Sequence, residues 1–139
     1  MNNKITVIIV AGKRQHTLFH FLHTLEVEIL QAKGLIVDKY FVIDSNKNLY
    51  NELKCLYPDD EIKYVSGNKG RVYCYNLAFG DVTNNNNNGT ANHSGHILLM
   101  SDLVGMRYNS LNIAFTTLCQ HFPDYDGVVG FEISITNNP

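Results

Sequence analysis

Apolar runs typical of strands alternate along the chain with segments that have helical spacing. The first run, Ile5–Val10, is rich in β-branched residues and does not alternate with polar positions, which is typical of a strand covered on both faces. Val37–Ile43 and Ile97–Met100 predict two more strands, the latter also buried. Ile62–Val65 alternates between apolar and polar residues and predicts an edge strand, and Val128–Ile135 predicts a fifth strand.

Between these strands, apolar residues recur every three or four positions, as on one face of a helix. Leu18, Leu22 and Leu25 are the clearest example, and Gly34 gives a stop after them. Pro58 and Pro123 limit two of the shorter helices. The four predicted helices are Gln15–Lys33, Leu49–Leu56, Arg71–Phe79 and Leu111–Leu118.

Strands joined by crossover helices form a mostly parallel sheet with helices on both faces. We therefore predict an α/β fold, a three-layer α/β/α sandwich with a mostly parallel, Rossmann-like sheet. The length of 139 residues fits one domain, residues 1–139. Residues 81–95 include a run of five asparagines and are too polar to bury, so we expect a mobile Asn-rich loop there.

Composition narrows the classes of partner. Eleven Lys and Arg against thirteen Asp and Glu give a net charge of −2, which disfavours nucleic acid as the main partner. Cys55, Cys74 and Cys119 form no CxxC pair, so neither a disulfide framework nor a zinc cluster is indicated. No apolar run approaches the roughly 18 residues of a membrane span, and no signal peptide follows the polar start. We expect a cytoplasmic protein.

Glycine, basic and acidic residues follow the predicted strands at their carboxyl ends, where ligands of parallel α/β sheets bind. The segments are Ala11–Arg14, Asp44–Ser45 and Ser101–Asp102, and we expect them to border one crevice. No GxGxxG follows the first strand, and Ala11–Arg14 lacks the upstream glycine of a Walker loop. Dinucleotide oxidoreductases and P-loop enzymes are therefore disfavoured.

The residues at this edge suit a phosphorylated, hydroxylated ligand. Gly12 lets backbone N–H groups approach a phosphate or a base, and Arg71 offers charge-assisted contacts to phosphate oxygens. Asp44 can accept from a base or ribose, and Asp102 can hold ribose or a divalent cation. Each also has an ordinary alternative as a turn former, helix cap or solvated residue. The histidines at positions 16, 20 and 23 share a helical face, but a polar stripe explains them better than a metal site.

Five segments, taken in order, resemble a known family. Ile5–Arg14 is similar to its first strand and nucleotide loop, with Val10-Ala11 where Pro-Thr is usual, and Phe41–Ser45 to its second strand with a base-binding Asp. Asn68–Asn76 resembles an Asn-x-Gly…Asn segment, Ile97–Leu103 falls where an Asp-x-Asp is usual, and Val128–Gly130 resembles the next strand. The set resembles a family 2-type glycosyltransferase of the GT-A fold, over nearly the whole chain.

The resemblance implies a chain that binds a nucleotide-diphosphate sugar, often UDP-linked, and transfers the sugar to an acceptor hydroxyl of unknown identity. It also implies a divalent cation, Mn or Mg, that stabilises the departing diphosphate, with Asp102 as the metal residue. No catalytic residue can be assigned. The implied nucleotide-sugar site comprises Ala11, Gly12, Lys13, Arg14, Asp44, Ser45, Asn68, Gly70, Arg71, Asn76, Ser101 and Asp102.

Two departures from the family keep a second interpretation open. Leu103 stands where the metal-ligating carboxylate is expected, and family members continue with an acceptor-binding half. The chain is therefore a glycosyltransferase or its donor-binding half, with further domains or a homo-oligomer as open partners. Alternatively, it is a catalytically inactive glycosyltransferase-like module for nucleotide binding or protein interaction. A flavodoxin-like or receiver-like domain is weaker, because Ala11–Lys13 replaces the acidic cluster expected there.

Overall fold

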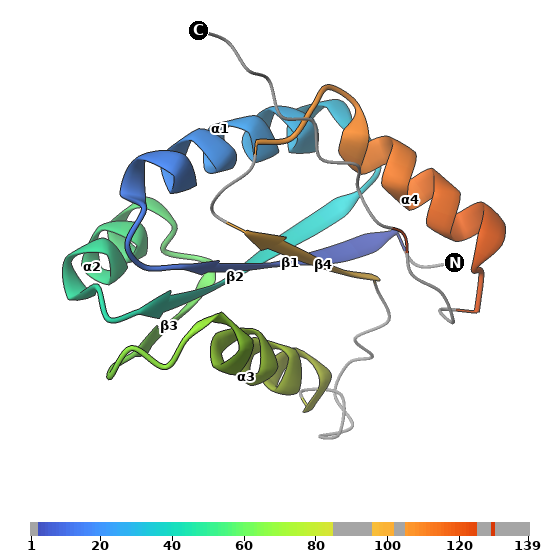
Figure 1. Ribbon diagram of the computed structural model, residues 1–139. Coiled ribbons are helices and arrows are strands. Elements are labelled where there is room, and N and C mark those ends of the chain that lie inside the picture. The colour runs from blue at the N-terminus through green and yellow to red at the C-terminus, as the bar shows by residue number, and fades with distance from the viewer. Residues whose placement is uncertain (1–2, 85–95, 102–104, 125–128, 130–139) are drawn as a thin grey trace, which may run out of the picture.

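The computed structural model describes residues 3–84, 96–101, 105–124 and 129. Within these ranges strands and helices alternate, as Figure 1 shows. The strands are β1 (Lys4–Ala11), β2 (Ile36–Asp44), β3 (Glu61–Val65) and β4 (His96–Ser101). The helices are α1 (Gln15–Gln31), α2 (Lys47–Leu56), α3 (Arg71–Asn84) and α4 (Ser110–His121).

The four described strands form one parallel sheet in the order β3-β2-β1-β4. Ala11 pairs with Ile43 and Val10 with Ser101, so the carboxyl ends of β1, β2 and β4 lie at one edge. The chain moves outward from β1 to β3 and then crosses back to β4. The strand order therefore reverses between β1 and β4, which is the switch point where such sheets bind ligands.

Strand β1 lies inside the sheet and is covered on both faces. Ile5, Val7 and Ile9 belong to one buried cluster, whereas Ile8 and Val10 belong to the other. Successive strand residues point to opposite faces, so a strand covered on both faces needs the unalternating apolar run that the sequence shows. The predicted three-layer, Rossmann-like α/β sandwich is confirmed.

The helices divide unequally between the two faces. Buried residues of α1, α2 and α4 share the cluster of Ile5 and Val7, while Cys74 and Ala78 of α3 share the cluster of Ile8. Figure 1 shows α1 and α4 on one side of the sheet and α3 on the other. None of the helices in the described ranges is long and apolar enough to cross a membrane.

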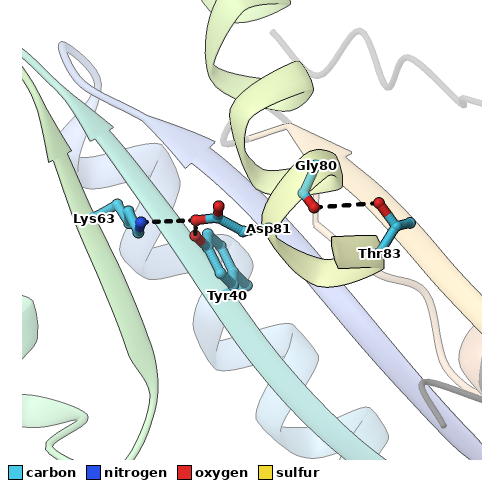
Figure 2. A network of polar contacts seen from close by, with 5 residues as sticks. All are labelled: Tyr40, Lys63, Gly80, Asp81 and Thr83. Carbon is cyan, nitrogen blue, oxygen red and sulfur yellow. Dashed lines mark hydrogen bonds and ion pairs between the residues drawn. The ribbon is translucent and has the colours of Figure 1, made fainter. Parts of the chain in front are cut away.

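Helix α3 continues to Asn84, beyond the predicted end at Phe79, so the expectation of a loop from residue 81 is wrong for residues 81–84. The reason is a tertiary contact. Asp81 accepts a hydrogen bond from the Tyr40 hydroxyl and pairs with Lys63 Nζ at 2.8 Å (Figure 2). These contacts hold the last turns of α3 against β2 and β3. Residues 85–95 lie outside the described residues.

The two edge strands differ in how well the sequence predicted them. Strand β3 lies at the predicted edge. Strand β4 lies at the other edge of the described sheet, and Leu99 is 53% exposed, so the expectation of a fully buried strand is wrong for this residue. The cluster around the buried residues of α3 contains residues of β1, β2 and β3 and, from β4, the partly buried Ile97 but not Leu99. The predicted fifth strand, Val128–Ile135, lies outside the described residues except for Val129.

Helix α4 is attached to α1 through a buried acidic residue. Glu28 is 2% exposed, and its carboxylate accepts from Asn109 N at 2.9 Å, Leu111 N at 3.0 Å and Ser110 Oγ at 3.2 Å. The first turn of a helix has N–H groups without intrahelical partners. Glu28 accepts from two backbone N–H groups at the start of α4, those of Asn109 and Leu111, which fixes how α4 packs on α1.

Candidate functional site

A pocket of about 240 Å³ opens at the carboxyl edge of the sheet. Its walls come from the end of β1, the β1–α1 loop, the end of β2, and the β3–α3 loop with the first residue of α3. The lining residues are Val10, Ala11, Gly12, Lys13, Arg14, Asp44, Asn68, Gly70 and Arg71.

The β1–α1 loop passes very close to the end of β2. A Cβ atom on Gly12 would lie 2.7 Å from the Asp44 carbonyl oxygen, so only glycine fits this approach. Asn46 then ties the two loops together, because its Nδ2 donates to the Gly12 carbonyl at 2.7 Å. Its Oδ1 accepts from Leu49 N at 3.1 Å and caps α2. One wall of the pocket is therefore fixed by backbone contact.

The Asp44 carboxylate organises the opposite wall. Its Oδ2 accepts from Gly70 N at 2.9 Å, and its Oδ1 accepts from Ser45 Oγ at 2.8 Å. Ser45 Oγ in turn accepts from Asn68 N at 2.7 Å. Asn68 and Gly70 have positive φ values of 52° and 90°, so the loop needs this support to hold its left-handed turns. Asp44 thus positions the start of α3.

These contacts also set the charge state of Asp44. Partial burial is the largest single influence and would raise the pKa, but hydrogen bonds from Gly70, Ser45 and Lys69 and the nearby charge of Lys13 together outweigh it. The pKa of Asp44 is therefore lowered from its ordinary value. The carboxylate is ionised at neutral pH and acts only as a hydrogen-bond acceptor.

Positive charge dominates the pocket. Among the residues that the structure describes, Lys13, Arg14 and Arg71 line it together with one carboxylate, Asp44. The first turns of α1 and α3, which begin beside these residues, contain no acidic residue. Because a helix N-terminus carries a partial positive charge and unpaired N–H groups, both helix starts add to the attraction for an anion. The pocket is suited to phosphate or a similar group.

The described residues do not fit the expected Mn or Mg site. Such a cation takes several oxygen ligands, commonly carboxylates, and Asp44 is the one carboxylate among the described residues that line the pocket. In the part of the chain that the structure describes, no three His, Cys, Asp or Glu side chains gather as a metal site. Asp102, the predicted metal residue, lies outside the described residues.

The structure brings most of the predicted site residues together. Ser45 does not line the pocket but contacts Asp44, while Asn76 is exposed on α3 and is not part of the lining. Ser101 ends β4, paired with Val10. Eight of the predicted residues line the pocket: Ala11, Gly12, Lys13, Arg14, Asp44, Asn68, Gly70 and Arg71.

Sequence reasoning missed two contributors to the pocket. The site residues that the sequence predicts include neither Val10 nor Asn46. Val10 lines the pocket because it lies near the carboxyl end of β1. The bond from Asn46 to Gly12 joins residues 34 positions apart, and no local pattern reports such a contact.

Fold and site together define an α/β protein with a parallel Rossmann-like sheet and a basic pocket at its carboxyl edge. Comparison with known proteins does not narrow this description further. No family model, curated protein or solved structure matches the chain significantly.

Proposed function

We propose that this chain binds the nucleoside diphosphate of a sugar donor and is a glycosyltransferase or the donor-binding half of one. The observation that carries the proposal is the pocket at the carboxyl edge, where three basic residues and one ionised carboxylate line the same space. An anionic group with neighbouring hydrogen-bond donors matches that arrangement, and a diphosphate attached to a nucleoside has both.

The two kinds of charge suggest how the ligand would lie. The diphosphate would face Lys13, Arg14 and Arg71, and the base or ribose would donate to Asp44. A carboxylate has about four lone-pair positions, so Asp44 retains acceptor capacity beyond the loop bonds. The volume of about 240 Å³ is below the roughly 300–1,000 Å³ of pockets that enclose whole drug-sized ligands. The pocket would therefore hold the diphosphate and part of the nucleoside, leaving the sugar outside.

The same charges suit glycosyl transfer. An acceptor hydroxyl attacks the anomeric carbon and gives its proton to solvent, the bond from that carbon to the diphosphate oxygen breaks, and the diphosphate leaves with the bonding electrons. Negative charge grows on the leaving group, and basic residues that line the pocket would stabilise the transition state. The donor is a nucleotide-diphosphate sugar, UDP-linked in our proposal, and the acceptor hydroxyl is left open.

A binding module without turnover is the second candidate. The single carboxylate that lines the described pocket, Asp44, is engaged with Gly70 and Ser45. It is therefore poorly placed to remove a proton from an acceptor. Loss of the sugar from a UDP-sugar, followed by release of UDP, would separate the two candidates, because a pure binding module would retain the donor intact.

Titration calorimetry with UDP and GDP tests the proposal. We expect one of them to bind, and Arg71→Gln to weaken that binding about tenfold, the loss typical of one charge-assisted contact. Arg107→Gln is the matched control, because Arg107 is exposed and lies outside the pocket lining. Absence of heat with both nucleotides at millimolar concentration would end the proposal.

A further inference from the structure

We infer that the diphosphate is held by Lys13, Arg14 and Arg71 directly, so that its binding requires no divalent cation. This inference rests on the proposed function and concerns the same pocket. It differs from the expectation drawn from the glycosyltransferase resemblance, in which Mn or Mg neutralises the leaving group.

The three basic residues reach the pocket from two layers of the fold. Lys13 and Arg14 belong to the loop that leads into α1, whereas Arg71 is the first residue of α3 on the opposite face of the sheet. Their side chains therefore approach a bound anion from both sides. A diphosphate offers oxygens in several directions, and this two-sided arrangement can contact both phosphate groups at once.

The described lining residues carry more positive than negative charge. The diphosphate of a nucleotide sugar carries one negative charge on each phosphate group. Among the residues that the structure describes, Lys13, Arg14 and Arg71 line the pocket together with one carboxylate, Asp44, although the chain as a whole has a net charge of −2. These residues therefore favour a ligand that carries negative charge.

Two of the basic side chains are not required by the fold itself. Lys13 and Arg14 are exposed, and neither forms an ion pair with another described residue. By contrast Lys4, Lys39 and Lys63 pair with acidic residues within 4.0 Å. Basic residues at the rim of a pocket that form no ion pair with a described residue are available for a ligand.

Among the described lining residues Asp44 is the one carboxylate, and both of its oxygens already accept hydrogen bonds. Asp44 Oδ1 and Oδ2 accept from Ser45 and Gly70 at 2.8 and 2.9 Å, and a cation on this carboxylate would compete with the bonds that support the β3–α3 loop. The positive charge of Lys13 also acts on Asp44 and would repel a cation there. The described residues thus disfavour a cation at Asp44, whereas Lys13, Arg14 and Arg71 favour an anion beside them.

Calorimetry with two probes and two conditions tests the inference. UDP and inorganic pyrophosphate are each titrated in excess EDTA and again in Mn²⁺. We expect both to bind in EDTA, with dissociation constants within about threefold of those in Mn²⁺. Arg71→Gln and Lys13→Gln should each weaken binding in EDTA about tenfold, and Arg107→Gln should not. Circular dichroism of each variant confirms that the fold is retained.

The outcomes separate this inference from the proposed function. Binding of UDP in Mn²⁺ but not in EDTA would overturn the inference and leave the proposed function standing. Binding of pyrophosphate in EDTA without any binding of UDP would support the inference and overturn the proposed nucleotide ligand. Binding of neither probe would overturn both. Equal affinity of the wild type and both pocket variants would also overturn the inference, because the charges would then not contact the ligand.

Discussion

Replacing Gly12 with alanine should destabilise the protein and disturb the pocket together. The added Cβ would lie 2.7 Å from the Asp44 carbonyl oxygen and 3.9 Å from its Cβ. The closest atom belongs to the backbone, so no side chain can rotate away, and the β1–α1 loop or the end of β2 must move by several tenths of an ångström. Inserting a carbon into a tightly packed place typically costs about 1–3 kcal/mol.

The movement also strains the bond that joins these loops. Asn46 Nδ2 donates to the Gly12 carbonyl at 2.7 Å, and a neutral hydrogen bond contributes about 1 kcal/mol. We therefore expect Gly12→Ala to lower the free energy of unfolding by about 2–3 kcal/mol. At roughly 3–4 °C per kcal/mol for a chain of this size, the melting temperature should fall by about 6–12 °C.

Gly80→Ala is the matched control for this substitution. Gly80 lies inside α3, and a Cβ there would meet no atom within 4 Å. Alanine is favoured over glycine in a helix interior by about 0.8–1 kcal/mol, so this variant should gain stability. Urea unfolding of both variants measures the difference. Our account of the loop contact is refuted if Gly12→Ala unfolds at the same urea concentration as the wild type.

Three further substitutions probe the polar contacts. The pKa of Asp44 is lowered in the folded protein, so the ionised carboxylate contributes to stability above the unfolded pKa near 4, and this contribution is lost as pH falls through the folded pKa. Between pH 7 and pH 3 the urea midpoint should therefore drop more for the wild type than for Asp44→Asn. Parallel curves for the two proteins would contradict this. Glu28→Ala should cost about 3 kcal/mol or more by urea unfolding, since the backbone N–H groups of Asn109 and Leu111 lose their acceptor. Glu28→Gln, which keeps one acceptor oxygen, should cost less, and equal losses would argue against capping. Asp81→Ala should remove the hydrogen bond from Tyr40 and the ion pair with Lys63, and amide hydrogen exchange in the last turns of α3 should increase. Unchanged exchange there would mean that the end of the helix does not depend on these two contacts.

The sequence predicted the fold where each segment carries its own pattern. The unalternating run of β1 and the leucine stripe of α1 reflect burial that all neighbouring residues share, so periodicity alone locates them. The end of α3 was missed because Asp81 follows Gly80 and precedes the Asn run, a context that indicates a loop. The helix continues there because Asp81 contacts Tyr40, which is 41 positions away in the sequence. The exposure of Leu99 likewise depends on where α3 lies.

The position of the candidate site could be predicted from the sequence, but the hydrogen bonds that hold its loops could not. The rule that ligands bind at the carboxyl ends of parallel strands placed Gly12, Asp44 and Arg71 near one another, and all three line the pocket. The part played by Asp44 in holding the loop was not predictable, because its bond to Gly70 spans 26 positions and requires the left-handed turn at Asn68. Such bonds depend on the folded loop and leave no periodic signal.

The residues at the pocket therefore fall into two groups that should respond differently to substitution. Gly12, Asp44 and Asn46 hold the loops by close contact and by hydrogen bonds, so their substitution should change stability first and affinity as a consequence. Lys13 and Arg14 are exposed and carry charge without a described ion pair. Substitution of such surface residues usually changes stability by less than about 0.5 kcal/mol, so affinity for an anion should fall while the melting temperature stays constant. If Lys13→Gln instead lowered the melting temperature as much as Gly12→Ala, the basic side chains would be structural, and the case for an anionic ligand would lose its main support.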